Sequence, residues 1–283
     1  MADTSEFSVS SLFNVQGKIA VITGGGSGIG TMIATAFVQN GAKVYIASRK
    51  EKQLKEVSER LNKIRPGACE YFVADIGSKA GCDKLVEDIK EKESKIHILV
   101  NNSGMSWGAP YENVPEKEGW DRVMALNVKS IFYLTVGLTD LLAKDATNSD
   151  PGRVINVSSI AGLSAVAEGS RVAGPGMGLW SYNTSKAAVN HLTSQLAVSL
   201  ASRRITVNAI LPGVFPSKMT AFGFKRMGGE DKMAEGHPWG RVGDPRDLAG
   251  VALFLVSPAS AYVTAAHIVV DGGGLISGGK AHM

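Results

Sequence analysis

The sequence predicts one α/β domain, built as a doubly wound, seven-stranded parallel sheet with helices on both faces. Two observations predict it. Seven short apolar runs rich in Val and Ile alternate with longer helical patterns, and no linker or fixed-period repeat divides the 283 residues. Nearly continuous apolar runs are typical of strands that are covered on both faces. Their alternation with helices implies parallel pairing.

In chain order, the predicted strands are Ile19–Thr23, Val44–Ala47, Tyr71–Ala74, Ile96–Val100, Val154–Val157, Thr206–Leu211 and His267–Val270. The first predicted helix has one apolar face and a stop signal at Asn40-Gly41; the face is formed by Ile29, Met32, Ile33, Ala36 and Phe37. A later helix is predicted over Trp180–Ala201. We expect the domain to span 17–275, after an N-terminal extension (1–16) and before a C-terminal tail (276–283).

Composition argues against several classes of protein. The net charge is +4, but the basic residues between Lys43 and Arg65 are interleaved with glutamates, which is typical of a solvated helix face and not of a nucleic-acid groove. Two cysteines, Cys69 and Cys82, are too few for a disulfide framework. The five histidines are scattered without zinc spacing, so no metal site is expected.

The ends of the chain predict a cytoplasmic protein without a membrane partner. The first 16 residues are polar, carry Asp3 and Glu6, and lack the basic and apolar regions of a signal peptide. No apolar run approaches the length of a membrane span. The last three residues do not resemble a peroxisomal address.

A glycine-rich segment, Gly24-Gly25-Gly26-Ser27-Gly28-Ile29-Gly30, joins the first strand to the first helix. Its backbone can approach a diphosphate closely, and the helix N-terminus offers free N–H groups to it. The spacing G-x-x-x-G-x-G differs from G-x-G-x-x-G, and a glycine loop alone could be a tight turn. The strand before it and the amphipathic helix after it favour dinucleotide binding.

The end of the second strand favours NADP(H) over NAD(H). Dinucleotide sites usually place an acid there to hold the ribose 2′-hydroxyl, whereas this strand ends Ala47-Ser48-Arg49-Lys50. A guanidinium can pair with a 2′-phosphate that a carboxylate would repel. The alternative is a surface arginine that pairs with the following helix. Asp75-Ile76, after the third strand, is expected beside the adenine.

Tyr182 and Lys186 are four residues apart in the predicted later helix and therefore share a face. A phenol has a pKa of about 10, and a neighbouring ammonium lowers it toward the range of an acid–base catalyst. Such a pair is common in isolation. Ser158-Ser159 ends the fifth strand, where a serine hydroxyl can donate to a substrate carbonyl oxygen. The alternative is that the two serines cap a loop.

These motifs together resemble the short-chain dehydrogenase/reductase family. The resemblance spans Gly17 to Gly273, and its motifs occur in order: Thr23-Gly24…Gly28-Ile29-Gly30, Asn101-Asn102-Ser103-Gly104, Asn127, Ser159, Tyr182/Lys186 and Pro212-Gly213. It implies a Rossmann arrangement and a homotetramer or homodimer.

The resemblance also implies catalytic roles. Tyr182 is the general acid, Lys186 lowers its pKa and holds the nicotinamide ribose, Ser159 fixes the substrate oxygen, and Asn127 supports a water. Ser159 is preferred to Ser158 because Ile160-Ala161-Gly162 follows it. The implied cofactor contacts are Thr23, Gly24, Ser27, Gly28, Ile29, Gly30, Ser48, Arg49, Asp75, Ile76, Asn102, Ser103, Gly104, Tyr182, Lys186, Pro212, Gly213, Val214 and Ser217.

The sequence departs from the family pattern at three places. Ser103 replaces the usual Ala. Between Ser159 and Tyr182 lie 22 residues where many relatives have about a dozen, so we expect a Gly-rich loop, within 163–180, beside the site. Ser217 stands where a Thr often grips the carboxamide.

The expected substrate is a hydrophobic ketone or a 3-oxoacyl group. The family resemblance implies that residues 216–240 cap the substrate, with apolar side chains from Met219, Phe222, Phe224, Met227 and Met233, although half of these could simply pack on the core. Trp107 and Trp180 are expected to wall the same pocket.

Within the family, the chain resembles 3-oxoacyl-thioester reductases of the rhamnolipid-pathway kind and fungal NADPH-dependent ketoreductases. Basic residues for an acyl-carrier partner are Arg171, Lys218, Lys225 and Arg226. The expected function is NADPH-dependent carbonyl reduction. The alternatives are an NAD(P)-dependent secondary alcohol dehydrogenase and a non-catalytic NADP(H)-sensing protein.

Overall fold

A computed structural model describes residues 7–169, 173–235 and 237–277 of the chain. Arg171 and most of the predicted C-terminal tail lie outside these described residues. Val15 belongs to the predicted N-terminal extension, yet it is 1% exposed and packs in the main core. The packed domain therefore begins before residue 17, earlier than expected.

The centre of the fold is a sheet of seven strands that pair in parallel throughout, in the order β3-β2-β1-β4-β5-β6-β7. The strands are β1 (Ile19–Thr23), β2 (Lys43–Ser48), β3 (Cys69–Val73), β4 (Ile98–Asn101), β5 (Gly152–Val157), β6 (Ile205–Pro212) and β7 (His267–Val270). The predicted Rossmann-type sheet is confirmed. The order reverses between β1 and β4, and ligands bind at such a switch point, beyond the carboxyl ends of the strands.

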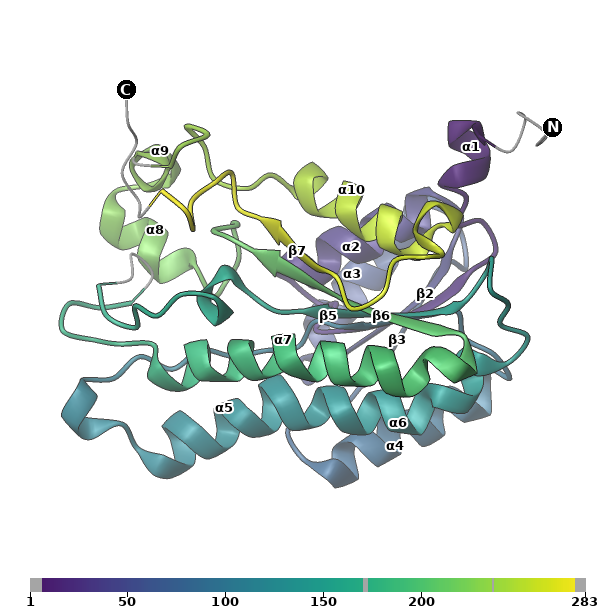
Figure 1. The fold of residues 1–283 in the computed structure, drawn as a ribbon, viewed down its shortest axis with the longest axis horizontal. Coiled ribbons are helices and arrows are strands. Elements are labelled where there is room, and N and C mark those ends of the chain that lie inside the picture. Colours follow the sequence, from purple (N-terminus) through teal and green to yellow (C-terminus); the bar gives the residue numbers. More distant parts are fainter. Residues whose placement is uncertain (1–6, 170–172, 236, 278–283) are drawn as a thin grey trace.

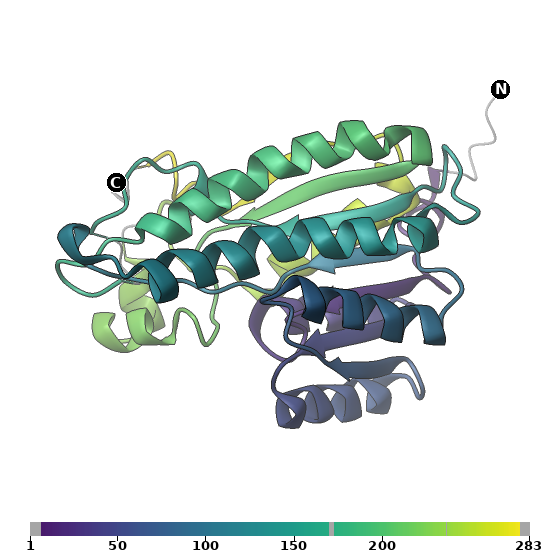
Figure 2. The same ribbon diagram turned by 90° about the horizontal axis from the view of Figure 1, so that it is seen from below.

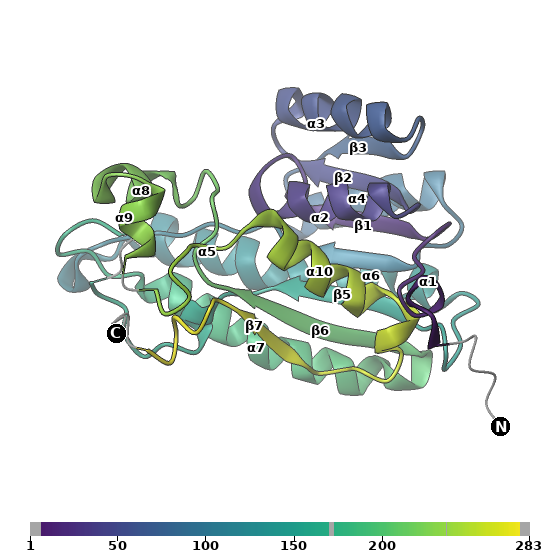
Figure 3. The same ribbon diagram turned by 90° about the horizontal axis from the view of Figure 1, so that it is seen from above.

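Helices cover both faces of the sheet (Figure 1), with α2, α3 and α10 on one side and α4, α6 and α7 on the other. Figures 2 and 3 show these two layers from opposite sides. Alternate β1 residues supply the two cores: Ile22 faces α2, and Val21 faces the α6 side. The helices are α1 (Val9–Leu12), α2 (Gly28–Gln39), α3 (Glu51–Ile64), α4 (Lys79–Lys92), α5 (Arg122–Met124), α6 (Ser130–Ala143), α7 (Trp180–Leu200), α8 (Ala221–Met227), α9 (Glu230–Ala234) and α10 (Pro245–Val256).

One continuous helical stretch, Glu116–Ala143, is long and apolar enough to cross a membrane by length and composition. The expectation that no segment reaches this length was wrong. Asp121, Arg122 and Lys129 interrupt the stretch, and its α6 part packs against α4 and the sheet through buried leucines. This packing identifies it as a core helix of the domain. Two π-helical turns, Glu116–Asp121 and Ala125–Lys129, flank α5.

Two chain segments overhang the carboxyl edge of the sheet. Helices α8 and α9, which follow β6 and precede α10 in the sequence, project from the domain (Figure 3). The long loop before α7 folds back on the segment after β4, because Ala109 and Gly178 exchange backbone hydrogen bonds of 3.1 and 2.8 Å. The Leu179 N–H donates to the Ala167 carbonyl over 2.9 Å, which closes the loop on itself.

Candidate active site

Two cavities meet at the carboxyl edge of the sheet. A cavity of about 330 Å³ runs from the glycine loop to α7, and a second of about 460 Å³ lies between the long loop before α7 and the cap. Tyr182 and Met219 line both cavities. The side chain of Tyr182 can therefore act on a molecule in either cavity.

The glycine loop forms a backbone cradle. A Cβ atom at Gly24 would come within 2.7 Å of Asn102 Nδ2, and one at Gly30 within 2.5 Å of the Gly24 carbonyl oxygen. Gly24 and Gly28 also have φ values of 68° and 56°, which residues with a Cβ atom rarely adopt. Ser27 precedes α2 but makes no side-chain capping bond. Gly28 and Ile29, at the start of α2, line the cavity, so the N-terminal N–H groups of this helix are placed to bind a phosphate group there.

Two predicted cofactor residues instead support this cradle. Thr23 is buried, and its Oγ1 accepts hydrogen bonds of 3.0 Å from the N–H groups of Asn102 and Ser103, which joins the ends of β1 and β4. Gly30 allows α2 to approach Gly24. Neither lines the cavity, whereas Gly24, Ser27, Gly28, Ile29, Asn102, Ser103 and Gly104 do.

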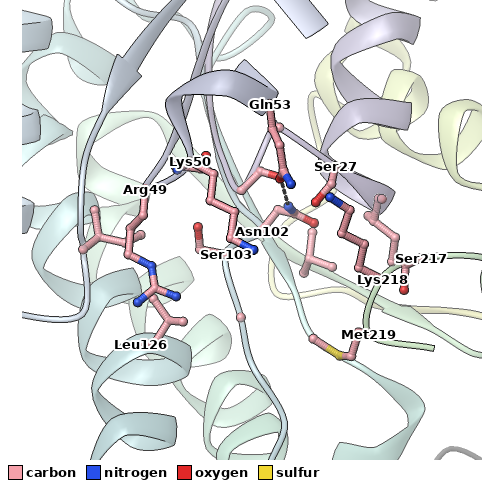
Figure 4. Close-up of a pocket in the computed structure, with 18 of the residues that line it drawn as sticks. Ser27, Arg49, Lys50, Gln53, Asn102, Ser103, Leu126, Ser217, Lys218 and Met219 are labelled. Carbon is pink, nitrogen blue, oxygen red and sulfur yellow. Dashed lines mark hydrogen bonds between the residues drawn. The ribbon is translucent and has the colours of Figure 1, made fainter. Parts of the chain in front are cut away.

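Ser48, Arg49, Asp75 and Ile76 line the far end of the same cavity, as expected of an adenosine site. Arg49 Nη1 lies 3.9 Å from Asp75 Oδ2, with both side chains more than half exposed, so Arg49 does not pair with the following helix. Figure 4 shows that the neighbouring Lys50 also extends across this cavity.

Some residues that line the cavity were not among the cofactor contacts expected from the sequence: Gly26, Lys50, Gln53, Ala74, Leu126, Val157, Ser158, Lys218 and Met219. For Lys50 a signal was present, because it directly follows Arg49 at the end of β2. For Leu126 and Gln53 no local motif marks a contact, since helices distant from the glycine loop in sequence bring them there.

Lys186 is held by the end of strand β5. It is 5% exposed, and its Nζ atom donates a hydrogen bond of 2.9 Å to the Val157 carbonyl. Nζ also lies 5.7 Å from the centre of the Tyr182 ring. Burial lowers the pKa of the Lys186 ammonium to about 8.

In the protein alone, burial raises the pKa of the Tyr182 phenol, and a hydrogen bond with Ser159 partly opposes this effect. The direction is opposite to the lowering by Lys186 that the sequence led us to expect. Desolvation prevails because the phenolate would be the buried charged form, while Lys186 already donates to a backbone carbonyl. The phenol is therefore protonated at neutral pH, which is the form that an acid needs.

The two serines after β5 face different groups. Ser158 Oγ donates a 3.0 Å hydrogen bond to the Lys186 carbonyl, so it holds α7 against the sheet. Ser159 lines the second cavity beside Tyr182, and its Oγ accepts from the Ala161 N–H over 3.1 Å. Ser159 can therefore contact a molecule in the second cavity, and its hydroxyl also caps the turn that follows.

Asn127 lies fully buried in a π-helical turn, a feature that often marks functional sites. Its Oδ1 accepts from the Met105 N–H, and its Nδ2 donates to the Met105 carbonyl and to Ser185 Oγ, each over 2.9 Å. A Cβ atom at Gly104 would lie 3.4 Å from Asn127 Oδ1 and 3.5 Å from Lys186 Nζ. Gly104 therefore keeps open the space between these two side chains.

The predicted residues after β6 divide between the cavities. Ser217 lines the first cavity and lies against the glycine loop, because a Cβ atom at Gly28 would come within 3.2 Å of Ser217 Cβ. Gly213 and Val214 line the second cavity. Pro212 is buried as the last residue of β6 and lines neither.

The second cavity is lined largely by apolar groups, in part from the long loop before α7. Val166, Ala167 and Leu179 come from this loop, so its predicted place beside the site is matched. The apolar lining residues are Ile160, Ala161, Val166, Ala167, Leu179, Val214, Met219 and Leu275. Apolar lining of this kind is suited to an apolar part of a ligand, although Glu168 and His237 also line the cavity.

The predicted aromatic wall and most of the predicted cap contacts do not form. Trp107 instead packs on Gly119, and Trp180 packs edge-on to Tyr111 at a centroid distance of 5.2 Å. Among the five predicted cap side chains, Met219 lines the cavity and Met233 is buried in packing, while Phe222 is largely exposed. The sequence cannot predict which of these side chains lines the cavity, because that depends on how the short helices α8 and α9 pack. Over the described ranges, no three potential metal ligands cluster.

Comparison with known proteins identifies the class. Residues 24–274 match the enoyl-(acyl carrier protein) reductase family. The chain is 39% identical, over 92% of its length and 97% of the relative's, to the rhamnolipids biosynthesis 3-oxoacyl-[acyl-carrier-protein] reductase of Pseudomonas aeruginosa. It is 33% identical to the short-chain dehydrogenase/reductase PhomF of Diaporthe leptostromiformis, over 93% of each chain.

A solved Pseudomonas aeruginosa structure, the RhlG/NADP active-site complex, superimposes with a TM-score of 0.84 at 38% identity, covering 93% of this chain and 98% of that one. The chain therefore belongs to the short-chain dehydrogenase/reductase family. It is an oxidoreductase that acts on alcohol and carbonyl groups, as the sequence predicted.

Proposed function

We propose that this protein is an NADPH-dependent carbonyl reductase in which Tyr182 is the general acid. The observation that carries the proposal is the place of Tyr182 between a dinucleotide-shaped cavity and an apolar one. Bound NADPH supplies a hydride to the carbonyl carbon. Tyr182 gives its phenolic proton to the carbonyl oxygen, and Ser159 donates a hydrogen bond to that oxygen as its negative charge develops.

Other side chains bind the cofactor and replace the proton. The glycine loop holds the diphosphate, Lys186 holds the nicotinamide ribose, and Ser217 holds the carboxamide. Asn127 supports a water in the space that Gly104 keeps open, through which Lys186 exchanges protons with solvent. The proposal is supported by the position of Gly104, because a Cβ atom there would lie 3.4 Å from Asn127 Oδ1 and 3.5 Å from Lys186 Nζ.

The preference for NADPH is carried by two adjacent cations. Arg49 and Lys50 both line the adenosine end of the cavity, where an acid would select NAD(H). Asp75 is the one carboxylate among the described lining residues, and it faces Arg49. The relative whose structure was solved with NADP supports the same choice.

The substrate is a hydrophobic ketone or a 3-oxoacyl thioester. The apolar second cavity suits an alkyl or acyl chain, and the relative with 39% identity is named for a 3-oxoacyl carrier-protein substrate. Oxidation of a secondary alcohol uses the same groups in reverse. It needs a phenolate at Tyr182, and burial disfavours that form.

The test is NADPH oxidation, followed at its absorbance, over a panel of simple ketones, 3-oxoesters and 3-oxoacyl thioesters. We expect turnover to rise with the length of the apolar chain. Tight NADPH binding with no oxidation across the whole panel would instead support the non-catalytic NADP(H)-sensing alternative.

The expected assembly is a cytoplasmic homotetramer or homodimer. Large apolar side chains remain exposed on the outer face of the domain, namely Phe132 and Val136 on α6 and Val198 on α7. A second copy of the chain can cover them. Light scattering after size exclusion checks the assembly, and a monomer at micromolar concentration would contradict it.

A further inference from the structure

Lys218 is exposed beside the site, where the sequence led us to expect a basic residue for an acyl-carrier partner. It lines the first cavity together with Gly26, Ser27 and Gly28 of the glycine loop. Figure 4 shows the side chain running from the segment beside Ser217 to the neighbourhood of Ser27. A cation of the substrate cap thus reaches the place where a diphosphate would rest.

Hydrogen bonds and packing position the backbone that carries Lys218. Thr220 Oγ1 donates a 2.7 Å hydrogen bond to the Phe215 carbonyl and accepts one of 2.9 Å from the Ser217 N–H. Phe215 itself is buried, and Gly243 packs against its ring. Ser217 lies directly against Gly28, so the turn is anchored on both the core and the glycine loop. The exposed Lys218 side chain extends from this turn.

The charges of this cavity are unbalanced. Its cations are Arg49, Lys50, Lys186 and Lys218, whereas its one described carboxylate, Asp75, faces Arg49. Among the described residues, no carboxylate lies within ion-pair distance of Lys218. An exposed, unpaired ammonium beside free helix N–H groups is suited to bind a phosphate dianion or diphosphate.

We propose that Lys218 binds the diphosphate bridge of the dinucleotide and thereby ties the substrate cap to the glycine loop. The proposal rests on the proposed function, because it needs a dinucleotide in the first cavity. It has a consequence for the substrate side. Met219, the next residue, lines both cavities, so fixing Lys218 also fixes one wall of the substrate pocket.

The experiment measures dissociation constants of NADPH and NADH for the intact protein by titration calorimetry. Both dinucleotides contain the diphosphate, so Lys218→Gln is expected to weaken both by about tenfold, the effect of one charge-assisted hydrogen bond. Lys218→Arg keeps the charge and is expected to stay within about threefold of the parent for both. Arg49→Gln is expected to weaken NADPH alone.

Lys55→Gln is the matched control. It removes the same charge from the exposed face of α3, outside the cavity, and is expected to leave both constants unchanged. Because Lys218 is exposed, its variants are expected to unfold at the parent temperature without cofactor. Hydrogen exchange gives a second readout: NADPH should protect residues 214–227 in the parent and less so in Lys218→Gln.

Each other result overturns the proposal. A loss for NADPH alone would place Lys218 at the 2′-phosphate, and unchanged constants would place it outside the cofactor site. If the parent protein binds neither dinucleotide, the proposed function itself fails. If the parent binds both and Lys218→Gln binds them equally well, the proposed function stands and this inference alone is overturned.

Discussion

The Nζ atom of Lys186 lies 5.7 Å from the centre of the Tyr182 ring but donates its hydrogen bond to the carbonyl of Val157. The lysine is therefore positioned by the sheet and not by the tyrosine. This arrangement leaves the phenol protonated and places a cation beneath it. Several consequences for activity and stability can be measured.

The two serines after β5 are expected to behave differently when mutated. Ser159→Ala removes the proposed donor to the substrate oxygen and is expected to lower kcat by about 10²-fold with little change in stability. Ser158→Ala removes a buried hydrogen bond to the Lys186 carbonyl, and we expect a loss of about 1 kcal/mol in the free energy of unfolding. Steady-state kinetics and urea unfolding separate the two effects. A larger loss of kcat in Ser158→Ala would reverse the assignment.

Cofactor preference is expected to depend on Arg49. Arg49→Asp replaces a cation that can pair with a 2′-phosphate by an anion that repels it, so kcat/KM for NADPH is expected to fall by about 10²-fold or more. The value for NADH is expected to hold or rise. Kinetics with both cofactors measure the ratio. Equal use of NADH and NADPH by the parent protein would count against the role of Arg49.

The two directions of reaction are expected to differ in pH dependence. Reduction needs the phenol, and because burial raises the pKa of Tyr182, reduction is expected to remain fast at neutral pH and to fall in alkali. Oxidation needs the phenolate, so its rate is expected to rise with pH across the same range. Rate profiles in both directions test this. An oxidation maximum near neutral pH would argue for a phenol acidified by its surroundings.

His97 is expected to make stability depend on pH. Its Nδ1 accepts a 3.0 Å hydrogen bond from the Ile19 N–H. Burial, with Lys18, Lys95 and Arg153 nearby, lowers its pKa from 6.5 to about 4, although Asp150 opposes this. The unfolded chain therefore binds more protons between these values, and stability is lost as pH falls from about 6.5 to 4.

Thermal unfolding across that range measures the effect of His97. In His97→Asn, the amide oxygen can keep the bond to Ile19 but does not titrate in this window. We therefore expect a shallower decline of the melting temperature in acid for this variant. An identical decline in both proteins would show that other groups control acid unfolding.

The sheet could be predicted from sequence because its signals are local. The runs Ile19–Thr23 and His267–Val270 match β1 and β7 at both ends, and the other strands differ by at most a few residues. The sequence also marked Ser159, Tyr182 and Lys186, since each lies at a fixed place relative to a strand or helix. The glycine loop was identified for the same reason.

The features of the site that the sequence could not predict depend on contacts between distant segments of the chain. Trp107 was expected in the pocket, yet it packs on Gly119, because the π-helical turn at 116–121 brings that glycine beneath it. Lys218 was considered only as a contact for an acyl carrier, and its place in the first cavity, next to a turn that packs on Gly28, is not marked by any motif. The direction of the Tyr182 pKa shift likewise depends on burial, which no motif encodes.

The most direct test of the account is the Tyr182→Phe variant, assayed for both NADPH binding and turnover with the best substrate of the panel. Loss of the phenolic proton is expected to reduce kcat by about 10³-fold or more, within the range of general acid catalysis, while the NADPH dissociation constant stays within about threefold of the parent. A variant that turns over at a near-parental rate would contradict the proposed role of Tyr182.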